Sequence, residues 1–242
     1  MDLSIVIPAF NESEKIAADI ETASQFLKGN NFIGEIIVVD DGSSDRTSEA
    51  AKKVAPALPT EVSLRVIRHE NNKGKGHAVR KGITESTGKY VMFSDSGCCV
   101  PYGNALLGLE MLKNGACDLA HGSRKMIESD IRKDQPLHRK ICSSLFKWFI
   151  RKILTIPSHI TDSQCGFKIY TGKVARKLYG QCVTDGFLFD IEIILRAQKE
   201  GHKIKEFPVE WVCDLDSRLS ITRAPWPTIS EIITIKRELA KK

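Results

Sequence analysis

Asp95 stands in a sequence context that suggests a ligand-binding role. It ends an apolar run in the stretch "VMFSDSGCC", residues 91 to 99, as expected for a strand that carries a carboxylate to a binding site. A second acid two residues later would give two oxygen ligands for a divalent cation beside a diphosphate. That position is Gly97. We therefore expect Asp95 to bind a ligand within an incomplete metal motif.

Two more polar stretches follow apolar runs: "PAFNE" comes after "LSIVIP", and "DDGSSD" comes after "EIIVVD". A helix that begins near Ser44 would place free N–H groups beside the second stretch, which favours an anion there. Asp45 fits the cap of that helix, whereas Asp40 comes too early to cap it. We interpret Asp40 as a ligand-binding residue.

The stretch "NNKGKGHAVRKG" is a basic turn that resembles a phosphate-binding loop only in part. It lacks the Walker spacing, and a dinucleotide fingerprint would need a third glycine where Val79 stands. Lys73, Lys75 and Lys81 remain as candidates to face an anion. The alternative is a solvated helix start.

These polar stretches alternate with regular elements up to about residue 125. Apolar runs of strand length ("LSIVIP", "EIIVVD", "VSLRVI", "KYVMFSD", "CDLAHG") are separated by helix-period segments near 12–28, 44–55, 75–86 and 101–114. This alternation predicts an α/β fold, with a Rossmann-like, mostly parallel sheet covered by helices on both faces. Ligands of such sheets bind beyond the carboxyl ends of the strands, where the polar stretches lie.

The second half of the chain has a different rhythm. A charged loop leads to a basic helix from about 138 to 156, a strand at "CGFKIY", a helix at about 187–200 and a strand at "KIKEFPVEW". No Pro- or Gly-rich linker separates the halves. We expect one domain, residues 1–242, in which the second half extends the sheet and forms the far side of a cleft.

Composition narrows the class of partner. A formal charge of +6 and a pI near 8.9, with scattered basic residues, favour anionic small molecules or an acidic membrane surface over nucleic acid. Seven cysteines without a C-x-x-C pair indicate reduced thiols in the cytoplasm. No export signal or apolar run of about 18 residues is present.

The basic helix near 138–156 suggests peripheral membrane contact. Ile141, Leu145, Trp148, Phe149 and Ile153 fall on one face of it, with basic residues on the opposite face. Such a helix suits an anionic interface. A core helix with a solvated basic edge is the alternative.

The motifs taken in order resemble a known family. "IVIPAFNE", "IIVVDDGSSDRT", "NKGKGHAVRKG", "GKYVMFSDSG", "HGSR", "TDSQCGFKIY", "GFLFDIEII" and "VEWVCDLDSRL" are similar to the inverting nucleotide-sugar glycosyltransferases of family 2, especially the dolichyl-phosphate glucosyltransferase and mannosyltransferase branch. The resemblance implies a GT-A fold, a UDP- or GDP-sugar donor, a polyprenyl phosphate acceptor, and Mg²⁺ or Mn²⁺ as cofactor. Residues 1–122 would then bind the nucleotide-sugar, and residues 123–242 would form the acceptor side.

The resemblance also implies roles for particular residues. Asp95 takes the place of the first metal-binding Asp, Gly97 that of the second, and Cys99 that of a further ligand in some relatives. Arg124 and Arg139 match arginines that bind the acceptor phosphate. The donor-binding set is Pro8, Phe10, Glu12, Asp40, Asp41, Gly42, Lys75, Asp95 and Arg218.

A lipid phosphate is already anionic near neutral pH and needs no strong base, so orientation and charge would carry the catalysis. A sugar hydroxyl acceptor would need a carboxylate base, for which Asp162 and Asp190 are the candidates; each could instead be structural. A nucleotide-sugar-binding protein without turnover would explain Gly97. A dinucleotide-dependent oxidoreductase would need glycines after the first strand, and "PAFNES" has none.

Overall fold

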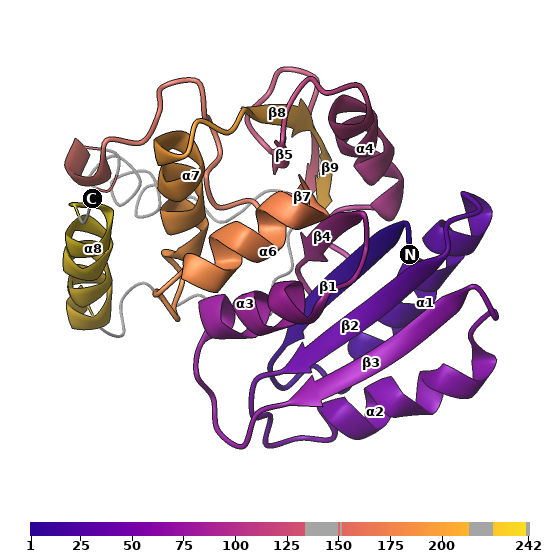
Figure 1. Ribbon diagram of the computed structural model, residues 1–242. Coiled ribbons are helices and arrows are strands. Elements are labelled where there is room, and N and C mark those ends of the chain that lie inside the picture. The colour runs from indigo at the N-terminus through magenta and orange to yellow at the C-terminus, as the bar shows by residue number, and fades with distance from the viewer. Residues whose placement is uncertain (134–149, 151, 213–224, 241–242) are drawn as a thin grey trace.

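The computed structural model describes residues 1–133, 150, 152–212 and 225–240. Its centre is a seven-stranded sheet in the order β3-β2-β1-β4-β7-β5-β8 (Figure 1). The strands are β1 Leu3–Ala9, β2 Gly34–Asp40, β3 Val62–Arg68, β4 Tyr90–Ser94, β5 Leu119–Ser123, β7 Phe167–Thr171 and β8 Ile204–Pro208. A separate two-stranded ribbon pairs β6 Asp130–Lys133 with β9 Glu210–Val212.

The sheet is parallel except at β7. Strands β1 to β4 run in one direction, and β7 pairs antiparallel with both β4 and β5. The register sets Ala9 of β1 opposite Asp40 of β2, so both strands end at the same level. The carboxyl ends of β1, β2 and β4 thus lie together at one end of the sheet, which we call the sheet edge, and the sequence predicts a ligand site there.

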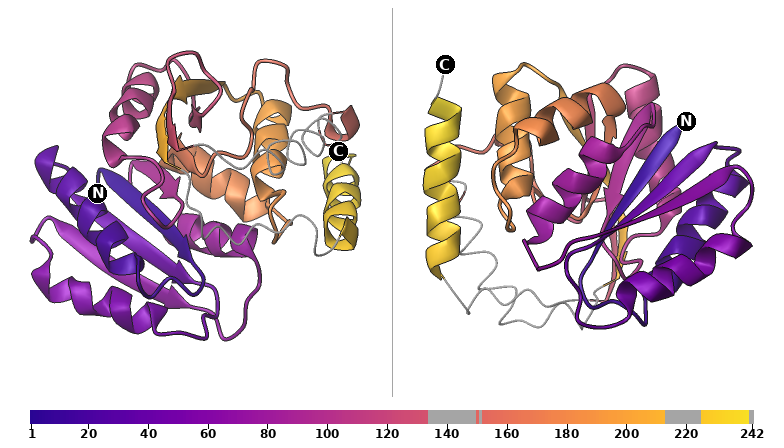
Figure 2. Two further views of the ribbon diagram at one scale, coloured as in Figure 1. Left: turned by 180° about the vertical axis from the view of Figure 1, so that it is seen from behind. Right: turned by 60° about the horizontal axis from the view of Figure 1, so that its bottom comes forward.

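Helices cover both faces of this sheet (Figures 1 and 2). Contacts place α1, α2 and α4 on one face and α3, α6 and α7 on the other, with α8 packed outside α7. Their bounds are α1 Ile16–Gly29, α2 Thr47–Val54, α3 Lys75–Glu85, α4 Ala105–Lys113, α6 Gly172–Gln181, α7 Phe189–Lys199 and α8 Pro225–Ala240. Short 3₁₀ helices occupy η1 Ala55–Ala57 and η2 Tyr102–Asn104.

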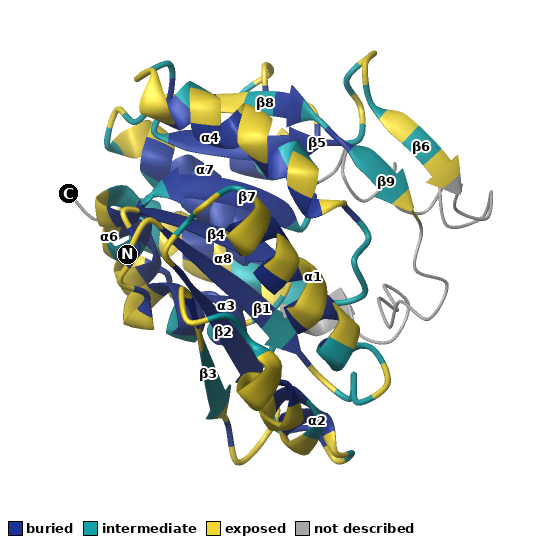
Figure 3. Ribbon diagram, turned by 90° about the vertical axis from the view of Figure 1, so that its right-hand side faces the viewer, coloured by how far each residue is buried: buried dark blue, intermediate teal, exposed yellow. Residues whose placement is uncertain are grey.

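The strands are apolar on both sides because each side meets a helical layer. Successive residues of a strand point to opposite faces, so Ile5 and Ile7 join the core under α1 and α4, while Val6 joins the core under α3, α6 and α7. Every residue of β2 is buried (Figure 3). This pattern explains why the strand sequences lack apolar–polar alternation.

The seven strands of the sheet confirm the predicted ones to within two or three residues at their ends, whereas three other elements were not predicted. These are helices α6 and α8 and strand β6. The helix expected from about 44 begins at Thr47. Of the basic helix expected at 138–156, residues 150 and 152–154 are described and helical, and the helix ends there because Thr155, with a φ of 53°, forms a turn; residues 138–149 and 151 lie outside the described residues.

Among the described residues, no helix is long and apolar enough to cross a bilayer.

Candidate active site

The loops after β1 and β2 are tied together at the sheet edge. Asn11, with a φ of 55°, accepts hydrogen bonds on its side-chain oxygen from the backbone N–H of Ser44 at 2.8 Å and from the Ser44 hydroxyl at 3.1 Å. Its own N–H donates to Ser43 Oγ at 2.8 Å. The "PAFNE" and "DDGSSD" stretches therefore form one rim, which these side-chain bonds extend beyond the backbone bond from the Asp41 N–H to the Ala9 carbonyl at 2.9 Å.

Asp40 is buried at the base of this rim. Its Oδ1 accepts from the Ser43 N–H at 2.9 Å, and its Oδ2 accepts from the Ser48 hydroxyl at the start of α2. The exposed Arg68 guanidinium lies 3.8 Å from Oδ2. Asp40 thus shapes the loop that the sequence assigns to the nucleoside.

Asp45 binds the first turn of α2, as the capping interpretation predicts. Its Oδ1 accepts from the Thr47 N–H at 3.0 Å and from the Thr47 hydroxyl, and Oδ2 accepts from the Ser13 N–H at 3.1 Å. Burial alone would raise the pKa of Asp45, but these hydrogen bonds lower it. The carboxylate stays ionised and holds α2 to the loop after β1.

Asp41 positions the basic turn. Its carboxylate accepts from the Lys73 N–H at 3.0 Å and the Gly74 N–H at 2.7 Å, and it lies 2.8 Å from His69 Nδ1. Gly42 beside it has a φ of 73°, and a Cβ there would meet the backbone of Asn71 at 2.5 Å. Asp41 and Gly42, which the sequence predicts to bind the nucleotide-sugar, therefore position the turn from which α3 begins.

Lys75 is the first residue of α3 and points toward β4. The preceding Gly74 has a φ of 106°, and a Cβ there would collide with the Asp185 carbonyl. The backbone N–H groups of Gly76 and His77 donate to carbonyls of Gly186 at 3.2 Å and Asp185 at 3.1 Å. The "NKGKGHAVRKG" turn thus binds a loop from the second half of the chain, which sets the direction of the Lys75 side chain.

The Lys75 ammonium group lies 2.6 Å from Asp95 Oδ1. Asp95 follows β4, donates its N–H to the Gly166 carbonyl at 2.9 Å, and packs so closely on Gly166 that a Cβ there would clash with the carboxylate. Burial alone would lower the pKa of Lys75, but the charges of Asp95 and Asp190 raise it. Both side chains of the pair are partly exposed to solvent.

A second carboxylate reaches the Asp95 loop, and it comes from helix α1. Asp19 is 2% exposed and accepts from Ser96 Oγ at 2.6 Å, from the Gly97 N–H at 3.0 Å to each oxygen, and from Cys98 Sγ at 3.0 Å. Gly97 and Cys98 have φ values of 95° and 47°. Glycine adopts such a conformation without steric cost, so Gly97 allows this turn to face Asp19.

Our sequence interpretation did not include Asp19, although a signal was present. In a helical projection it falls beside Ile16, Ile20 and Ala23, which form the buried face of α1. A lone acid on an apolar face needs a partner to be buried. Here the partner is the loop after β4.

Beneath Asp95 lies a buried ion pair that the sequence analysis also did not anticipate in full. Lys168 of β7 is 0% exposed, and its ammonium lies 2.5 Å from Asp190 Oδ1 and 2.8 Å from the Cys165 carbonyl. Burial raises the pKa of Asp190 while Lys168 and Lys75 oppose the rise. Asp190 therefore acts as the partner of a buried cation at the floor of the site.

Arg124, directly after β5, is held on two sides. Its Nε and Nη2 donate to Asp162 at 2.6 and 2.9 Å, and its guanidinium carbon lies 5.3 Å from the centre of the Trp211 ring. Glu206 fixes Asp162 in turn by accepting its N–H at 2.7 Å. Burial alone would lower the pKa of Arg124, but hydrogen bonding and the charge of Asp162 raise it.

A guanidinium group has five N–H donors, and Asp162 takes two of those on Arg124. The other three have no hydrogen-bond partner among the described residues. They can bind a further anion in an orientation that Asp162 fixes.

The remaining predicted residues lie as follows. Pro8 is half-buried at the end of β1, Phe10 is exposed, and the Glu12 N–H donates to Thr47 Oγ1 at 2.8 Å. Arg139 and Arg218 lie outside the described residues, as do Trp148 and Phe149.

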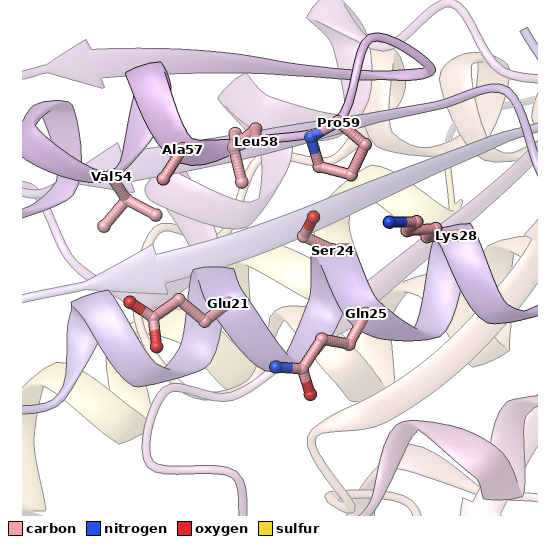
Figure 4. Close-up of a pocket in the computed structure, with 8 residues that line it drawn as sticks. All are labelled: Glu21, Ser24, Gln25, Lys28, Val54, Ala57, Leu58 and Pro59. Atoms are coloured by element: carbon pink, nitrogen blue, oxygen red, sulfur yellow. The ribbon is translucent and has the colours of Figure 1, made fainter.

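A hollow elsewhere on the molecule is separate from this site. It lies between α1 and the segment that follows α2 (Figure 4). None of the predicted site residues lines it; its lining residues are Glu21, Ser24, Gln25, Lys28, Val54, Ala57, Leu58 and Pro59.

With this geometry in place, the chain can be compared with known proteins. Residues 4–179 match the family described as glycosyl transferase family 2. This chain belongs to that family.

Relatives whose names state an enzymatic activity are similar to this family 2 chain over most of its length. The dolichyl-phosphate beta-glucosyltransferase of Dictyostelium discoideum is 30% identical over 218 residues, which cover 86% of this chain and 66% of the relative. The Homo sapiens protein of the same name is 30% identical over 223 residues, covering 86% and 67%. The chain thus spans about two thirds of the length of these relatives.

A solved structure agrees with the fold. Glucosyl-3-phosphoglycerate synthase from Mycobacterium tuberculosis, in complex with Mn²⁺, UDP and glucosyl-3-phosphoglycerate, gives a TM-score of 0.64 at 17% identity, covering 98% of this chain and 77% of that chain. The predicted GT-A fold is therefore confirmed. A divalent metal is a feature of the family.

Asp95 is the metal ligand that the sequence predicts among the described residues. Among the described residues no three His, Cys, Asp or Glu side chains come together as a metal site. Asp19 cannot serve as a second ligand while both its oxygens bind the Gly97 N–H. Magnesium, however, is commonly held by one or two carboxylates together with substrate phosphates and water. The residues fit an ion that arrives with a diphosphate.

Proposed function

We propose that this chain transfers a hexose from a nucleotide-sugar to the phosphate of a polyprenyl phosphate, with inversion at the anomeric carbon. The observation that carries the proposal is Arg124, which Asp162 and Trp211 hold at the sheet edge with N–H groups left for an anion. Arginine held in this way suits bidentate recognition of a phosphate. The names of the relatives, dolichyl-phosphate beta-glucosyltransferases, support dolichyl phosphate as the acceptor and glucose as the sugar.

The state of the two candidate bases favours a phosphate over a hydroxyl acceptor. Asp162 is bound by Arg124, and Asp190 is bound by Lys168 at the floor of the site. Neither carboxylate is placed to take a proton from a sugar hydroxyl. A phosphate oxygen attacks without that proton transfer, because it is already anionic near neutral pH.

The reaction then proceeds by one displacement. A phosphate oxygen held by Arg124 forms a bond to the anomeric carbon as the bond from that carbon to the donor diphosphate breaks. The nucleoside diphosphate leaves with the electron pair of the broken bond. Arg124 orients the nucleophile, and Lys75 offsets charge that develops on the diphosphate.

Mg²⁺ or Mn²⁺ is the proposed cofactor, held by Asp95 and the phosphates of the donor. When bound, the ion neutralises charge on the departing diphosphate. We take a UDP-sugar as the first donor to test, since the structurally similar glucosyl-3-phosphoglycerate synthase was solved with UDP, with GDP-sugars as the alternative.

Peripheral attachment to the cytoplasmic face of a membrane completes the proposal. The acceptor is a lipid, and the segment from 141 to 154 has an aromatic face opposite a basic one. Its described end, with Ile150 and Leu154 buried, packs into the core.

Arg124→Ala tests the acceptor role. The variant should transfer glucose from UDP-glucose to dolichyl phosphate at a rate lowered by about tenfold or more, the effect of losing a charged hydrogen bond. Its affinity for UDP-glucose, measured by calorimetry, should stay unchanged. Lys125→Ala, which removes the exposed basic neighbour, is the control and should transfer normally. Parental transfer by Arg124→Ala would exclude this phosphate site.

A nucleotide-sugar-binding protein without turnover is the second candidate, because Gly97 leaves the metal motif incomplete. Donor binding without transfer or hydrolysis, for every donor, metal and lipid phosphate tried, would favour it.

A further inference from the structure

The ion pair between Lys75 and Asp95 occupies the position where the family expects a metal ion. The ammonium lies 2.6 Å from Oδ1, and a divalent cation that bound the same oxygen would be repelled by this nearby positive charge. The carboxylate is therefore already neutralised by a group of the chain itself.

Among the described residues, each cation around this pair has a carboxylate partner. Lys75 pairs with Asp95, Arg124 with Asp162 and Lys168 with Asp190, and Asp19 adds one more carboxylate at the Asp95 loop. A doubly negative diphosphate added to such a site gains little net attraction. A diphosphate that brings a divalent cation leaves the total charge unchanged.

The pair can also open, unlike the two beneath and beside it. Each of those two pairs has a buried member, since the side chains of Lys168 and Asp162 are 0% and 1% exposed, although that of Arg124 is 21% exposed. Both members of the Lys75–Asp95 pair are exposed, by 24% and 36%. Lys75 is the first residue of α3, so its flexible side chain swings from a fixed backbone position. A ligand at the sheet edge can reach it without disturbing the core.

We propose that Lys75 is an exchangeable counterion. In the free protein it holds Asp95 and excludes a divalent cation; when the donor binds, it moves to the diphosphate, and Asp95 becomes free to hold the ion that accompanies the donor. This inference rests on the proposed function only in taking a nucleoside diphosphate as ligand. By linkage, donor and metal should then strengthen each other's binding by the same factor.

Lys75→Met separates the two proposed roles of Lys75, which are to exclude a divalent cation from Asp95 and to bind the diphosphate. The loss of the first role should strengthen metal binding, whereas the loss of the second should weaken nucleotide binding. The variant without donor should bind Mn²⁺ about tenfold more tightly than the parent, within the usual range of coupling between interacting sites. Its affinity for UDP should fall by about tenfold, as for the loss of a charged hydrogen bond. The loss of free Mn²⁺ signal in electron paramagnetic resonance gives the first quantity, and calorimetry with UDP gives the second.

Two further variants locate the effect. Lys81→Met removes a lysine of the same helix that pairs with Glu85 at 2.9 Å, and it should bind Mn²⁺ as the parent does. The double variant Lys75→Met, Asp95→Asn should lose the gain in Mn²⁺ affinity, since the carboxylate is then absent. Circular dichroism confirms that each variant is folded.

The parent should bind Mn²⁺ weakly alone and about tenfold more tightly with UDP present. Tight Mn²⁺ binding by the free parent, no gain in Lys75→Met, or a gain that persists in the double variant would each overturn the proposal. None of these measurements uses a lipid acceptor. Failure of sugar transfer together with the expected Mn²⁺ result would reject the proposed function and leave this inference intact.

Discussion

Individual side chains in this site serve mainly to orient one another. Asp162 fixes Arg124, Lys168 fixes Asp190, and Asp41 fixes the turn that carries Lys75. Such pre-orientation lets a site bind charge without reorganising during the reaction. It also means that a change at one member of a pair alters the partner's position as well as its own charge.

Asp40→Asn tests the nucleoside side of the site. The amide can still accept from Ser43 and donate to Ser48, so the loop should persist while the negative charge is lost. UDP-glucose binding should weaken by roughly 1–3 kcal/mol, measured by calorimetry. Asp45→Asn, on the same loop, shows how much of any loss comes from loosening that loop. Unchanged donor affinity in Asp40→Asn would remove Asp40 from the site.

Sequence reasoning found the residues that end strands but not the ones that support them. Asp95, Lys75 and Arg124 could be predicted because motif position and the rule of strand ends both point to them. Asp19 and Lys168 could not be assigned a partner, because their contacts join segments far apart in the chain. Each left a signal only as a charged residue on an apolar face.

At the scale of elements, side chains join helices to loops that the sheet does not connect. Asp19 ties α1 to the loop after β4, Glu192 ties α7 to the segment after α6, and Glu231 of α8 accepts from the Gly186 N–H at 2.6 Å. These contacts position the loops at the sheet edge. The candidate site therefore depends on helices that lie outside it.

Asp19→Ala should destabilise the Asp95 loop. It leaves donors of Ser96, Gly97 and Cys98 without their acceptor, at a cost of about 1–3 kcal/mol in the free energy of unfolding, because the loop is half-buried and water can replace part of the bonding. Urea unfolding measures the loss. Asp19→Asn keeps one acceptor oxygen and should recover part of it; equal stability of Asp19→Ala and the parent would refute this role.

The environment of Glu192 predicts that the free energy of unfolding depends on pH. It is 0% exposed and accepts from the N–H groups of Val183 and Thr184 and from Arg196. Burial alone would raise the pKa of Glu192, but these bonds lower it below its ordinary value of 4.5. A carboxylate with a lowered folded-state pKa stabilises the fold above its unfolded-state value, and this stabilisation is lost as the pH falls through the folded-state pKa.

Glu192→Gln should therefore be less stable than the parent by roughly 1–3 kcal/mol near neutral pH. The difference should shrink as the pH falls below 4.5. Urea unfolding of both proteins across this range measures it. A difference that stays constant with pH would show that the charge of Glu192 contributes nothing.

Physical features of the sequence explain why α6, α8 and β6 were not predicted. Helix α6 begins at Gly172 and includes Gly180, and both read as turn signals. Helix α8 starts with Pro225 and Pro227, which suggest a loop although proline is tolerated in a first turn. Strand β6 is charged and pairs with β9, about 80 residues later, so no local pattern marks it.

At the scale of the whole molecule, one sheet joins the two halves of the chain. Strand β7 comes from the second half and inserts between β4 and β5 of the first. Asp95, from the first half of the chain, thereby lies against Gly166, from the second half. The candidate site forms where the two halves meet.

A net charge of +6 and the aromatic face of the 141–154 segment predict membrane binding. Sedimentation with liposomes should show binding that rises with anionic lipid and falls with salt. The variant Trp148→Glu, Phe149→Glu should bind less. Ile33→Glu, at another exposed apolar position before β2, is the control and should bind like the parent. Equal binding of the double variant and the parent would refute attachment through this segment.

The most direct test of the account compares two acceptors that differ by one group. The purified chain, with Mg²⁺ and UDP-glucose or GDP-mannose carrying a labelled sugar, is given either dolichyl phosphate or dolichol. Because we propose that Arg124 binds the acceptor phosphate, and because Asp162 and Asp190 are each paired with a cation, we predict a labelled glycolipid from dolichyl phosphate alone, with inverted anomeric configuration. Labelled glycolipid from dolichol at a comparable rate would contradict the account.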